Sequence, residues 1–165
     1  MGRIRALAGV ISLSAGLLFS TANLAYAAQP APELVLNLTS QQVKLSDYQG
    51  QVVYLDFWAS WCKPCQRSFP WMNDMQAKYG EQGFTVIAVN LDTERKLADD
   101  FLSKLPAHFP VAFDPSGNSA QTYQLKGMPT SYLIDKTGQL RIAHQGFHID
   151  KQASYEQEIQ GLLAE

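Results

Sequence analysis

The sequence predicts an α/β domain in which a mixed central sheet is flanked by helices. Three observations lead to this fold class. Two apolar runs enclose an amphipathic helical pattern, and a strand, helix, strand order gives a parallel pair with a crossover. A hairpin pattern later in the chain adds antiparallel strands, and a final helical pattern follows it. We therefore expect parallel and antiparallel strands in one sheet.

The first predicted strands and helix surround the two cysteines. Residues 52–58 are β-branched and aromatic, which is typical of a strand buried on both faces, and Asp56 alone breaks the apolar run. After the cysteines, apolar residues recur at helical spacing until Gly80 and Gly83 end the pattern. These residues are Phe69, Met72, Met75 and Tyr79. Residues 84–90 form the second apolar strand.

The next predicted element is a helix over residues 94–105, with Thr93 as its N-cap. Its apolar stripe consists of Leu97, Phe101, Leu102 and Leu105. Residues 111–113 predict a short strand, and residues 114–118 have the composition of a turn.

The last third of the chain predicts a hairpin and a helix. Residues 130–134 and 140–144 read as its two strands, with a turn at residues 135–138. A helix begins at about Lys151 and carries an apolar face. The hairpin and this helix complete the predicted α/β domain.

The first 27 residues have the pattern of a cleaved export signal. Arg3 and Arg5 precede an uncharged apolar run over residues 6–19, and Ala25-Tyr26-Ala27 has the A-x-A form of a cleavage site. The run is shorter than the roughly 20 residues of a membrane-spanning helix. We expect a periplasmic or otherwise extracytoplasmic protein, with an uncleaved N-terminal membrane anchor as the alternative.

The remaining chain predicts one domain over residues 33–165, preceded by a short linker over residues 28–32. Cleavage lowers the basic count from 13 to 11 against 15 acidic residues, and no long run of like charge remains. Nucleic acids and anionic lipid surfaces are therefore poor partner candidates.

Cys62 and Cys65 are the two cysteines of the chain, and two residues separate them. A structural disulfide that closes so short a loop restricts the unfolded chain little. A zinc site needs about four ligands, and the histidines have no metal-ligand spacing to the cysteines. They are His108, His144 and His148. We therefore expect a redox pair, with no metal and no cofactor.

The position of Cys62 favours a reactive thiolate. It lies where a strand has ended and a helix begins, so unpaired N–H groups and the positive end of the helix dipole face its sulfur. Lys63 adds a weak favourable charge. Pro64 fits the first helical turn, where an N–H has no partner to lose. We expect Cys62 to be the nucleophile and the more shielded Cys65 to be the resolving thiol.

Two motifs carry a resemblance to a known family. Residues 56–65, with Pro70 five positions later, resemble the active-site segment of thioredoxins. Residues 127–130 resemble their cis-proline loop. The insertion over residues 92–124 and the preamble over residues 45–50 are similar to the TlpA-like branch of exported thiol-disulfide reductases, which includes ResA-, CcmG- and DsbE-like proteins. The resemblance implies a thioredoxin fold with a TlpA-type insertion before the cis-proline loop.

The resemblance also implies which residues bind substrate. Pro129 would follow a cis peptide bond opposite the sulfurs, leaving the backbone of Met128 free to pair with an extended substrate segment. Thr130 completes this loop. An ordinary turn proline is the alternative. Trp61 would shape the docking surface beside the cysteines, with simple core burial as its alternative.

Two acids have roles that the resemblance leaves open. Burial should raise the pKa of Asp56, and the matching acid of thioredoxins is a proton relay for the resolving cysteine. Thioredoxins place a lysine on the neighbouring strand, whereas residues 86–89 contain none. Glu94 matches a glutamate that often modulates specificity in TlpA-like reductases, although the dipole favours an acid in any first helical turn.

The expected reaction begins when reduced Cys62 attacks a disulfide in an exported protein, and Cys65 then resolves the mixed disulfide. A partner must reduce the pair again, and the resemblance suggests a membrane thiol electron donor of the DsbD or CcdA type. A role in cytochrome c maturation follows from the same branch.

Other functions remain open. The reduction potential decides whether the pair is a reductase, an oxidase or an isomerase. A non-catalytic binding module with a closed disulfide is the alternative from another class. Peroxidase chemistry is disfavoured because the chain has no P-x-x-x-T-x-x-C arrangement, and copper delivery would favour a wider cysteine spacing with a dedicated histidine.

Overall fold

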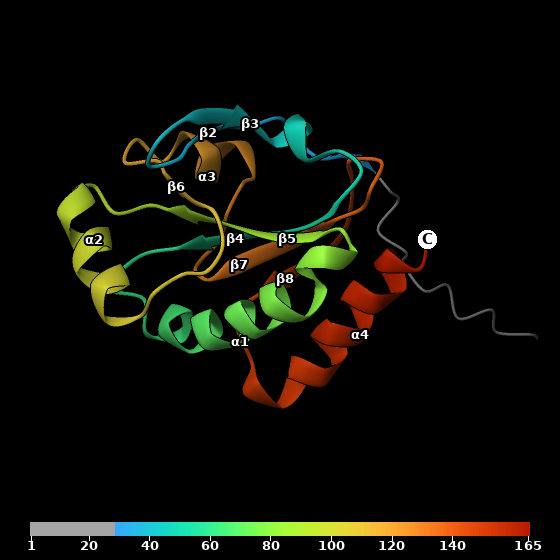
Figure 1. The fold of residues 1–165 in the computed structure, drawn as a ribbon. Helices are drawn as coiled ribbons and strands as arrows, with labels where there is room; N and C mark the ends of the chain where they lie inside the picture. The colour runs from blue at the N-terminus through green and yellow to red at the C-terminus, as the bar shows by residue number, and fades with distance from the viewer. Residues whose placement is uncertain (1–28) are drawn as a thin grey trace, which may run out of the picture.

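The computed structural model describes residues 29–165, and a six-stranded mixed sheet runs through its centre (Figure 1). The strand order is β1-β8-β7-β4-β5-β6. Strands β4, β5 and β6 are parallel to one another, whereas β7, β8 and β1 join by antiparallel pairing. The bounds are β1 Gln29–Pro30, β4 Val52–Trp58, β5 Phe84–Asn90, β6 Val111–Phe113, β7 Thr130–Ile134 and β8 Gln139–Gln145. The predicted mixed sheet is confirmed.

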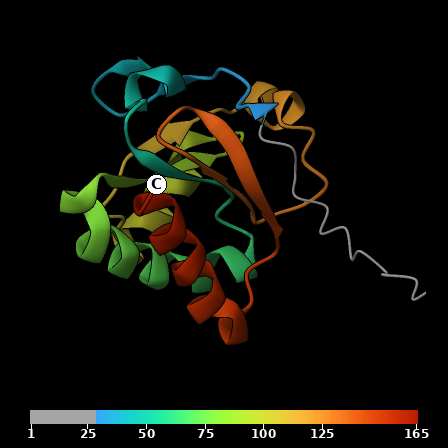
Figure 2. The same ribbon diagram turned by 90° about the vertical axis from the view of Figure 1, so that its right-hand side faces the viewer.

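Strand β4 separates two layers of core because its side chains alternate between the faces. Tyr54 and Trp58 belong to one apolar cluster, together with both cysteines. Leu55 and Phe57 belong to the other. Figures 1 and 2 show that helices α1 and α4 cover the first face and that the β2–β3 pair covers the second. The cysteines therefore lie on the helical side of the sheet.

The helices on the first face follow the predicted pattern closely. Helix α1 spans Lys63–Tyr79 and helix α4 spans Gln152–Leu163. A 3₁₀ turn, Gly80–Gln82, continues α1 until Gly83 adopts a positive φ of 88°. Only a residue without a Cβ takes this backbone conformation at little cost, so Gly83 ends the segment.

Helix α2 differs from the prediction at its start and in its buried face. It spans Arg95–Lys104, and Glu94 instead of Thr93 occupies the N-cap, with no side-chain capping hydrogen bond. Leu97, expected in the apolar stripe, is 42% exposed, whereas the side chain of Ala98 is buried. The stripe is rotated because Phe101 packs against Trp58 with ring centroids 4.6 Å apart, and this tertiary contact sets which face points inward.

The second face carries elements that the sequence pattern did not reveal. Strands β2 (Val35–Asn37) and β3 (Gln42–Lys44) form a two-stranded sheet, followed by the 3₁₀ helix Leu45–Tyr48. Helix α3 covers Asn118–Thr122. A third 3₁₀ turn, Ile149–Lys151, which the pattern also did not reveal, leads directly into α4 on the first face. These elements have three to five residues, which is too short to show a period.

The N-terminal predictions lie partly outside the described residues. The expected export signal, residues 1–27, and Ala28 fall there. Within the expected linker, Gln29 and Pro30 pair with β8, and the Ala31 N–H donates to the Gly138 carbonyl at 2.9 Å. Across residues 29–165, the helices are too short or too polar for any of them to cross a membrane.

Candidate active site

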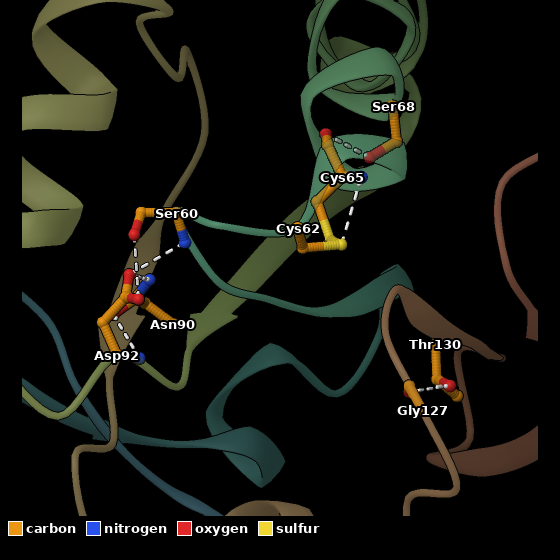
Figure 3. The surroundings of a disulfide bond; sticks show 8 residues. All are labelled: Ser60, Cys62, Cys65, Ser68, Asn90, Asp92, Gly127 and Thr130. Carbon is orange, nitrogen blue, oxygen red and sulfur yellow. Dashed lines mark hydrogen bonds between the residues drawn. A yellow bond between two sulfur atoms is a disulfide. The ribbon is translucent and has the colours of Figure 1, made fainter.

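Cys62 and Cys65 form a disulfide at the N-terminus of α1, where β4 has ended (Figure 3). Cys62 occupies the N-cap, and its Sγ accepts a hydrogen bond from the Cys65 N–H at 3.3 Å. A helix N-terminus presents unpaired N–H groups and a positive dipole end. The same geometry therefore stabilises a thiolate on Cys62 once the disulfide is reduced.

Both cysteines are largely buried. Cys62 is 4% exposed, whereas Cys65 is fully buried, and both belong to the apolar cluster that contains Phe69 and Met72. The small difference has the direction expected of an attacking and a resolving cysteine, and these two roles stay predictions.

The loop before Cys62 is held by a buried carboxylate that the sequence reading missed. Asp92 Oδ2 accepts a hydrogen bond from the Ser60 N–H at 2.9 Å, and Asp92 Oδ1 accepts one from the Ser60 hydroxyl at 2.9 Å. The Asn90 side-chain amide donates to Asp92 Oδ2 at 2.8 Å (Figure 3). Three donors on Ser60 and Asn90 thus hold the Asp92 carboxylate. This Ser60–Asp92 clamp fixes the loop at a point two residues before Cys62, the predicted nucleophile.

The sequence contains a pattern from which the Ser60–Asp92 clamp could have been predicted. Asn90 is a polar residue at the end of an otherwise apolar strand, and it pairs in register with Trp58 at the end of β4. Parallel strands bring their carboxyl ends to one edge of the sheet, which is where α/β proteins place functional loops. Asp92 follows two residues later.

The peptide bond between Met128 and Pro129 is cis, as the resemblance implied. The Thr130 hydroxyl donates to the Gly127 carbonyl at 2.7 Å, and the Gly146 N–H donates to the Pro129 carbonyl at 2.8 Å. Met128 packs against the cluster that contains both cysteines. Within residues 29–165, no backbone hydrogen bond uses the N–H or carbonyl of Met128. That backbone is available for an added strand.

Asp56 is buried on the same face of β4 as Tyr54 and Trp58. Its Oδ2 has no hydrogen-bond partner among the described residues. Burial raises the pKa of the Asp56 carboxyl well above its ordinary value, which confirms the direction expected from the sequence. Its partner in β5 is Ala88, and no lysine is present on that strand. The carboxyl therefore has no cation there to hold its negative charge.

Trp61 and Glu94 both lie at the surface. Trp61 is 68% exposed, so the alternative of simple core burial is wrong. Glu94 is exposed at the N-cap of α2, and no hydrogen bond or ion pair of its side chain is found in the described part of the chain. Its predicted role as a modulator stays a prediction.

A groove of about 530 Å³ opens between helix α2 and the redox loop, the segment over residues 59–62 that joins β4 to α1. Ser60 and Gln66 line it on the side of the cysteines, and Leu97 and Phe101 line it on the side of α2. Asp100, Lys104 and Leu105 complete its wall. The exposed side chain of Leu97 thus gives the surface beside the disulfide an apolar patch.

None of residues 29–165 belongs to a group of three or more His, Cys, Asp or Glu side chains that could hold a metal ion. His108 and His148 are exposed. His144 instead bonds to Glu158, with 2.8 Å between Nε2 and Oε2.

Comparisons with known proteins agree with this geometry. Residues 27–143 match the model of the AhpC/TSA family. The thiol-disulfide oxidoreductase ResA of Bacillus thuringiensis subsp. konkukian is 39% identical over 111 residues, which are 67% of this chain and 64% of the relative. The match therefore spans a little less than two thirds of that protein.

Solved structures extend the match over most of the described chain. A candidate thiol:disulfide interchange protein DsbE from Chlorobium tepidum is 52% identical, with a TM-score of 0.81 over 82% of this chain and 96% of the other. A candidate protein disulfide isomerase from Bacteroides thetaiotaomicron is 27% identical, with a TM-score of 0.77 over 84% and 90% of the two chains. The predicted thioredoxin fold is confirmed.

Proposed function

The chain belongs to the AhpC/TSA family, and from that premise we propose that it is an exported thiol-disulfide oxidoreductase that reduces disulfides in extracytoplasmic proteins. The observation that carries the proposal is the Cys62–Cys65 disulfide at the N-terminus of α1, with the Cys62 sulfur accepting an N–H hydrogen bond. The relative ResA is named a thiol-disulfide oxidoreductase, and this supports disulfide exchange as the reaction.

The reaction runs in two exchange steps. The Cys62 thiolate attacks one sulfur of a substrate disulfide, forms a mixed disulfide and releases the first substrate thiolate. Cys65 then gives up its proton, and its thiolate attacks Cys62 Sγ. This closes the Cys62–Cys65 bond and releases the second substrate thiolate. The substrate gains two electrons, and the protein gains the disulfide.

We propose that Asp56 accepts the proton that Cys65 gives up. The carboxyl lies on the same face of β4 as Tyr54 and Trp58, which belong to the cluster that contains both cysteines, and burial raises its pKa well above its ordinary value, which makes it a better proton acceptor. If Asp56→Asn left the pH dependence of thiol exchange unchanged, this assignment would be wrong.

The proposed substrate is an extended protein segment. The free backbone of Met128 would pair with it, while Trp61 and the groove lined by Leu97 and Phe101 would hold its apolar side chains. Glu94, near the start of α2, is the proposed modulator of this choice. Pro129 and Thr130 fix the backbone that does the pairing.

The protein needs an external source of electrons, because the chain has no third cysteine to form a relay pair. We propose a membrane thiol donor of the DsbD or CcdA type, and a place in cytochrome c maturation, on the resemblance to the TlpA-like branch. Recovery of the protein from the periplasm tests the proposed extracytoplasmic location. Its measured mass should be that of a chain that begins at Ala28 after cleavage of the export signal.

Trapping tests the activity directly. Cys65→Ser should accumulate mixed disulfides between Cys62 and its substrates, since the resolving thiol is gone, and these should appear on non-reducing gels. Cys62→Ser is the matched control and should trap nothing. Absence of adducts in Cys65→Ser, with Cys62 still reactive to an alkylating reagent, would refute the reductase mechanism.

An isomerase or oxidase is the second candidate, favoured by the likeness to the candidate protein disulfide isomerase from Bacteroides thetaiotaomicron. The reduction potential of the cysteine pair separates a reductase from an oxidase or isomerase. A value near about −270 mV is that of a reductant, and one near about −120 mV is that of a strong oxidant. Equilibration with glutathione or dithiothreitol buffers measures it. A non-catalytic module would show no insulin reduction in the presence of dithiothreitol.

A further inference from the structure

Four side chains that the exchange chemistry does not use form a polar chain from the interior to the surface. The Ser131 hydroxyl donates to the Tyr54 hydroxyl at 2.7 Å, and its oxygen lies 3.5 Å from His144 Nδ1. His144 Nε2 lies 2.8 Å from Glu158 Oε2. Tyr54 and Ser131 are buried. The His144 side chain is 12% exposed and that of Glu158 is 29% exposed, so the chain ends in contact with water.

The inner end of this polar chain lies beside Asp56. Ser131 on β7 is the direct partner of Asp56 in the register with β4, and directly opposite side chains on one face have Cβ atoms about 4.5–5.5 Å apart. Tyr54 is two residues earlier on β4 and shares the face. The carboxyl of Asp56 raises the pKa of Tyr54, after the larger effect of burial. Asp56 Oδ2 itself has no partner.

We propose that Tyr54, Ser131, His144 and Glu158 carry the proton between Asp56 and solvent, in a protein whose strand β5 offers no lysine for this purpose. The proposal rests on the function proposed above and on the role of Asp56 in it. These four are positioning and relay residues, since none of them touches the reacting sulfurs.

The proton balance is complete in each half of the cycle. When Cys65 attacks Cys62, its proton passes to the Asp56 carboxylate and from there to the Ser131–Tyr54 hydroxyl pair. The Ser131 hydroxyl, which donates to Tyr54 in the resting state, turns and hands its proton to His144 Nδ1, and the Nε2 proton leaves through Glu158 to water. When a donor reduces the disulfide, a proton returns by the same steps in reverse, which restores the starting tautomer of His144. No electrons move along this route.

The surroundings of His144 suit a neutral imidazole that can accept and donate. Burial lowers the pKa of His144, the Glu158 charge opposes that effect, and the charge of Lys151 adds to it. Tyr155 on α4 packs its ring 4.5 Å from the imidazole and holds its orientation. Together with Tyr54 on β4, these are the titratable groups that face it.

The test is a single turnover of the full-length mature protein with oxidised glutathione. Reduced protein is mixed with the disulfide, acid-quenched at short times, and the decay of the Cys62–glutathione adduct is followed by mass between about pH 6 and 9. Ser131→Ala and His144→Ala interrupt the polar chain in the interior, and Glu158→Gln interrupts it near the surface. His108→Ala is the matched control, because this histidine is exposed and lies outside the polar chain.

We expect adduct decay about tenfold slower in Ser131→Ala and His144→Ala at the low end of this range, below the 10²–10⁴ of a complete acid–base group. The deficit should shrink as pH rises, since hydroxide can then take the proton directly. Added imidazole should restore His144→Ala and leave His108→Ala unchanged. Glu158→Gln, which is conservative and near the surface, should show a smaller deficit of the same shape.

Two results would overturn the inference. One is decay in all three variants equal to that in His108→Ala. The other is a deficit that is the same at every pH and insensitive to imidazole, which is what a purely structural role predicts. A wild-type protein that forms no adduct would instead refute the proposed function, and this inference would fall with it.

Discussion

The two faces of the central sheet differ in the side chains that strand β4 contributes to them. On the face covered by β2, β3 and α3, strand β4 presents Val53, Leu55 and Phe57, which are apolar and buried. On the face covered by α1 and α4, the same strand presents Asp56 and Trp58, whose Oδ2 and Nε1 atoms have no hydrogen-bond partner within residues 29–165.

This difference between the faces has a consequence for the free energy of unfolding. A buried polar atom without a partner costs about 1–3 kcal/mol, whereas burial of an apolar side chain contributes about 1.5–3 kcal/mol. Buried apolar side chains on both faces therefore stabilise the domain, whereas the unpartnered polar atoms of Asp56 and Trp58 on the cysteine face lower its stability. Both kinds of residue come from one strand of seven residues.

The largest expected effect is on the apolar face. Phe57 is fully buried and its ring lies 5.4 Å from that of Tyr123. Phe57→Ala should lower the free energy of unfolding by about 3–5 kcal/mol, since it removes buried surface and leaves a cavity. Insulin reduction per folded molecule should not change. Urea denaturation measures the loss, and a value below about 1 kcal/mol would contradict the division between the faces.

The clamp on the redox loop should give the next largest effect. Asp92→Asn replaces a carboxylate that accepts from Ser60 and Asn90 by an amide whose NH₂ faces those donors. We expect a loss of about 1–3 kcal/mol in unfolding free energy and slower reduction of insulin. Asp99→Asn in α2 is the control, because Asp99 is exposed in an i,i+4 pair with Arg95 and should change stability by less than about 0.5 kcal/mol. Equal stability of the two variants would show that the clamp contributes nothing.

A third experiment measures the instability on the cysteine face. The folded pKa of Asp56 is raised, so the native state holds a proton that the unfolded state has already lost above about pH 4. The unfolding free energy should therefore fall as pH rises, by about 1.4 kcal/mol per pH unit, until the folded pKa is passed. Asp56→Asn should remove this slope. Denaturation of the oxidised protein at a series of pH values checks it, and identical slopes in both proteins would exclude a raised pKa.

The smallest effect on stability is expected at Trp61. This side chain is 68% exposed, so Trp61→Ala should change the unfolding free energy by less than about 0.5 kcal/mol. If it docks substrate, KM for a peptide disulfide should rise about fivefold, equivalent to about 1 kcal/mol, with kcat retained. Glutathione disulfide, which carries no extended protein segment to dock, serves as the control substrate. An equal loss on both substrates would argue against docking.

Local patterns in the sequence were sufficient for much of the fold and for the redox pair. The apolar run 52–58 predicted β4 to the residue, and the run 84–90 did the same for β5. Both depend on a continuous stretch of β-branched and aromatic side chains. The roles of Trp61 and of the proline loop at Pro129 came from resemblance to a family, and the cis bond agrees with it.

Contacts between distant segments decided the rest. Ser60 meets Asp92, and Tyr54 meets Ser131, 77 residues away, because the sheet places their strands together. The buried face of α2 likewise follows from where Phe101 meets Trp58.

The sequence by itself therefore determined the long core strands β4 and β5 and the cysteine pair, since each depends on residues that are neighbours in the chain. The extracytoplasmic compartment stays a prediction from the same kind of local pattern. The tertiary structure alone decided which polar groups share one face with the disulfide. The alternation of β4 put Asp56 there, and pairing with β7 put Ser131 opposite it. Strand register depends on the whole sheet, and no local pattern specifies it.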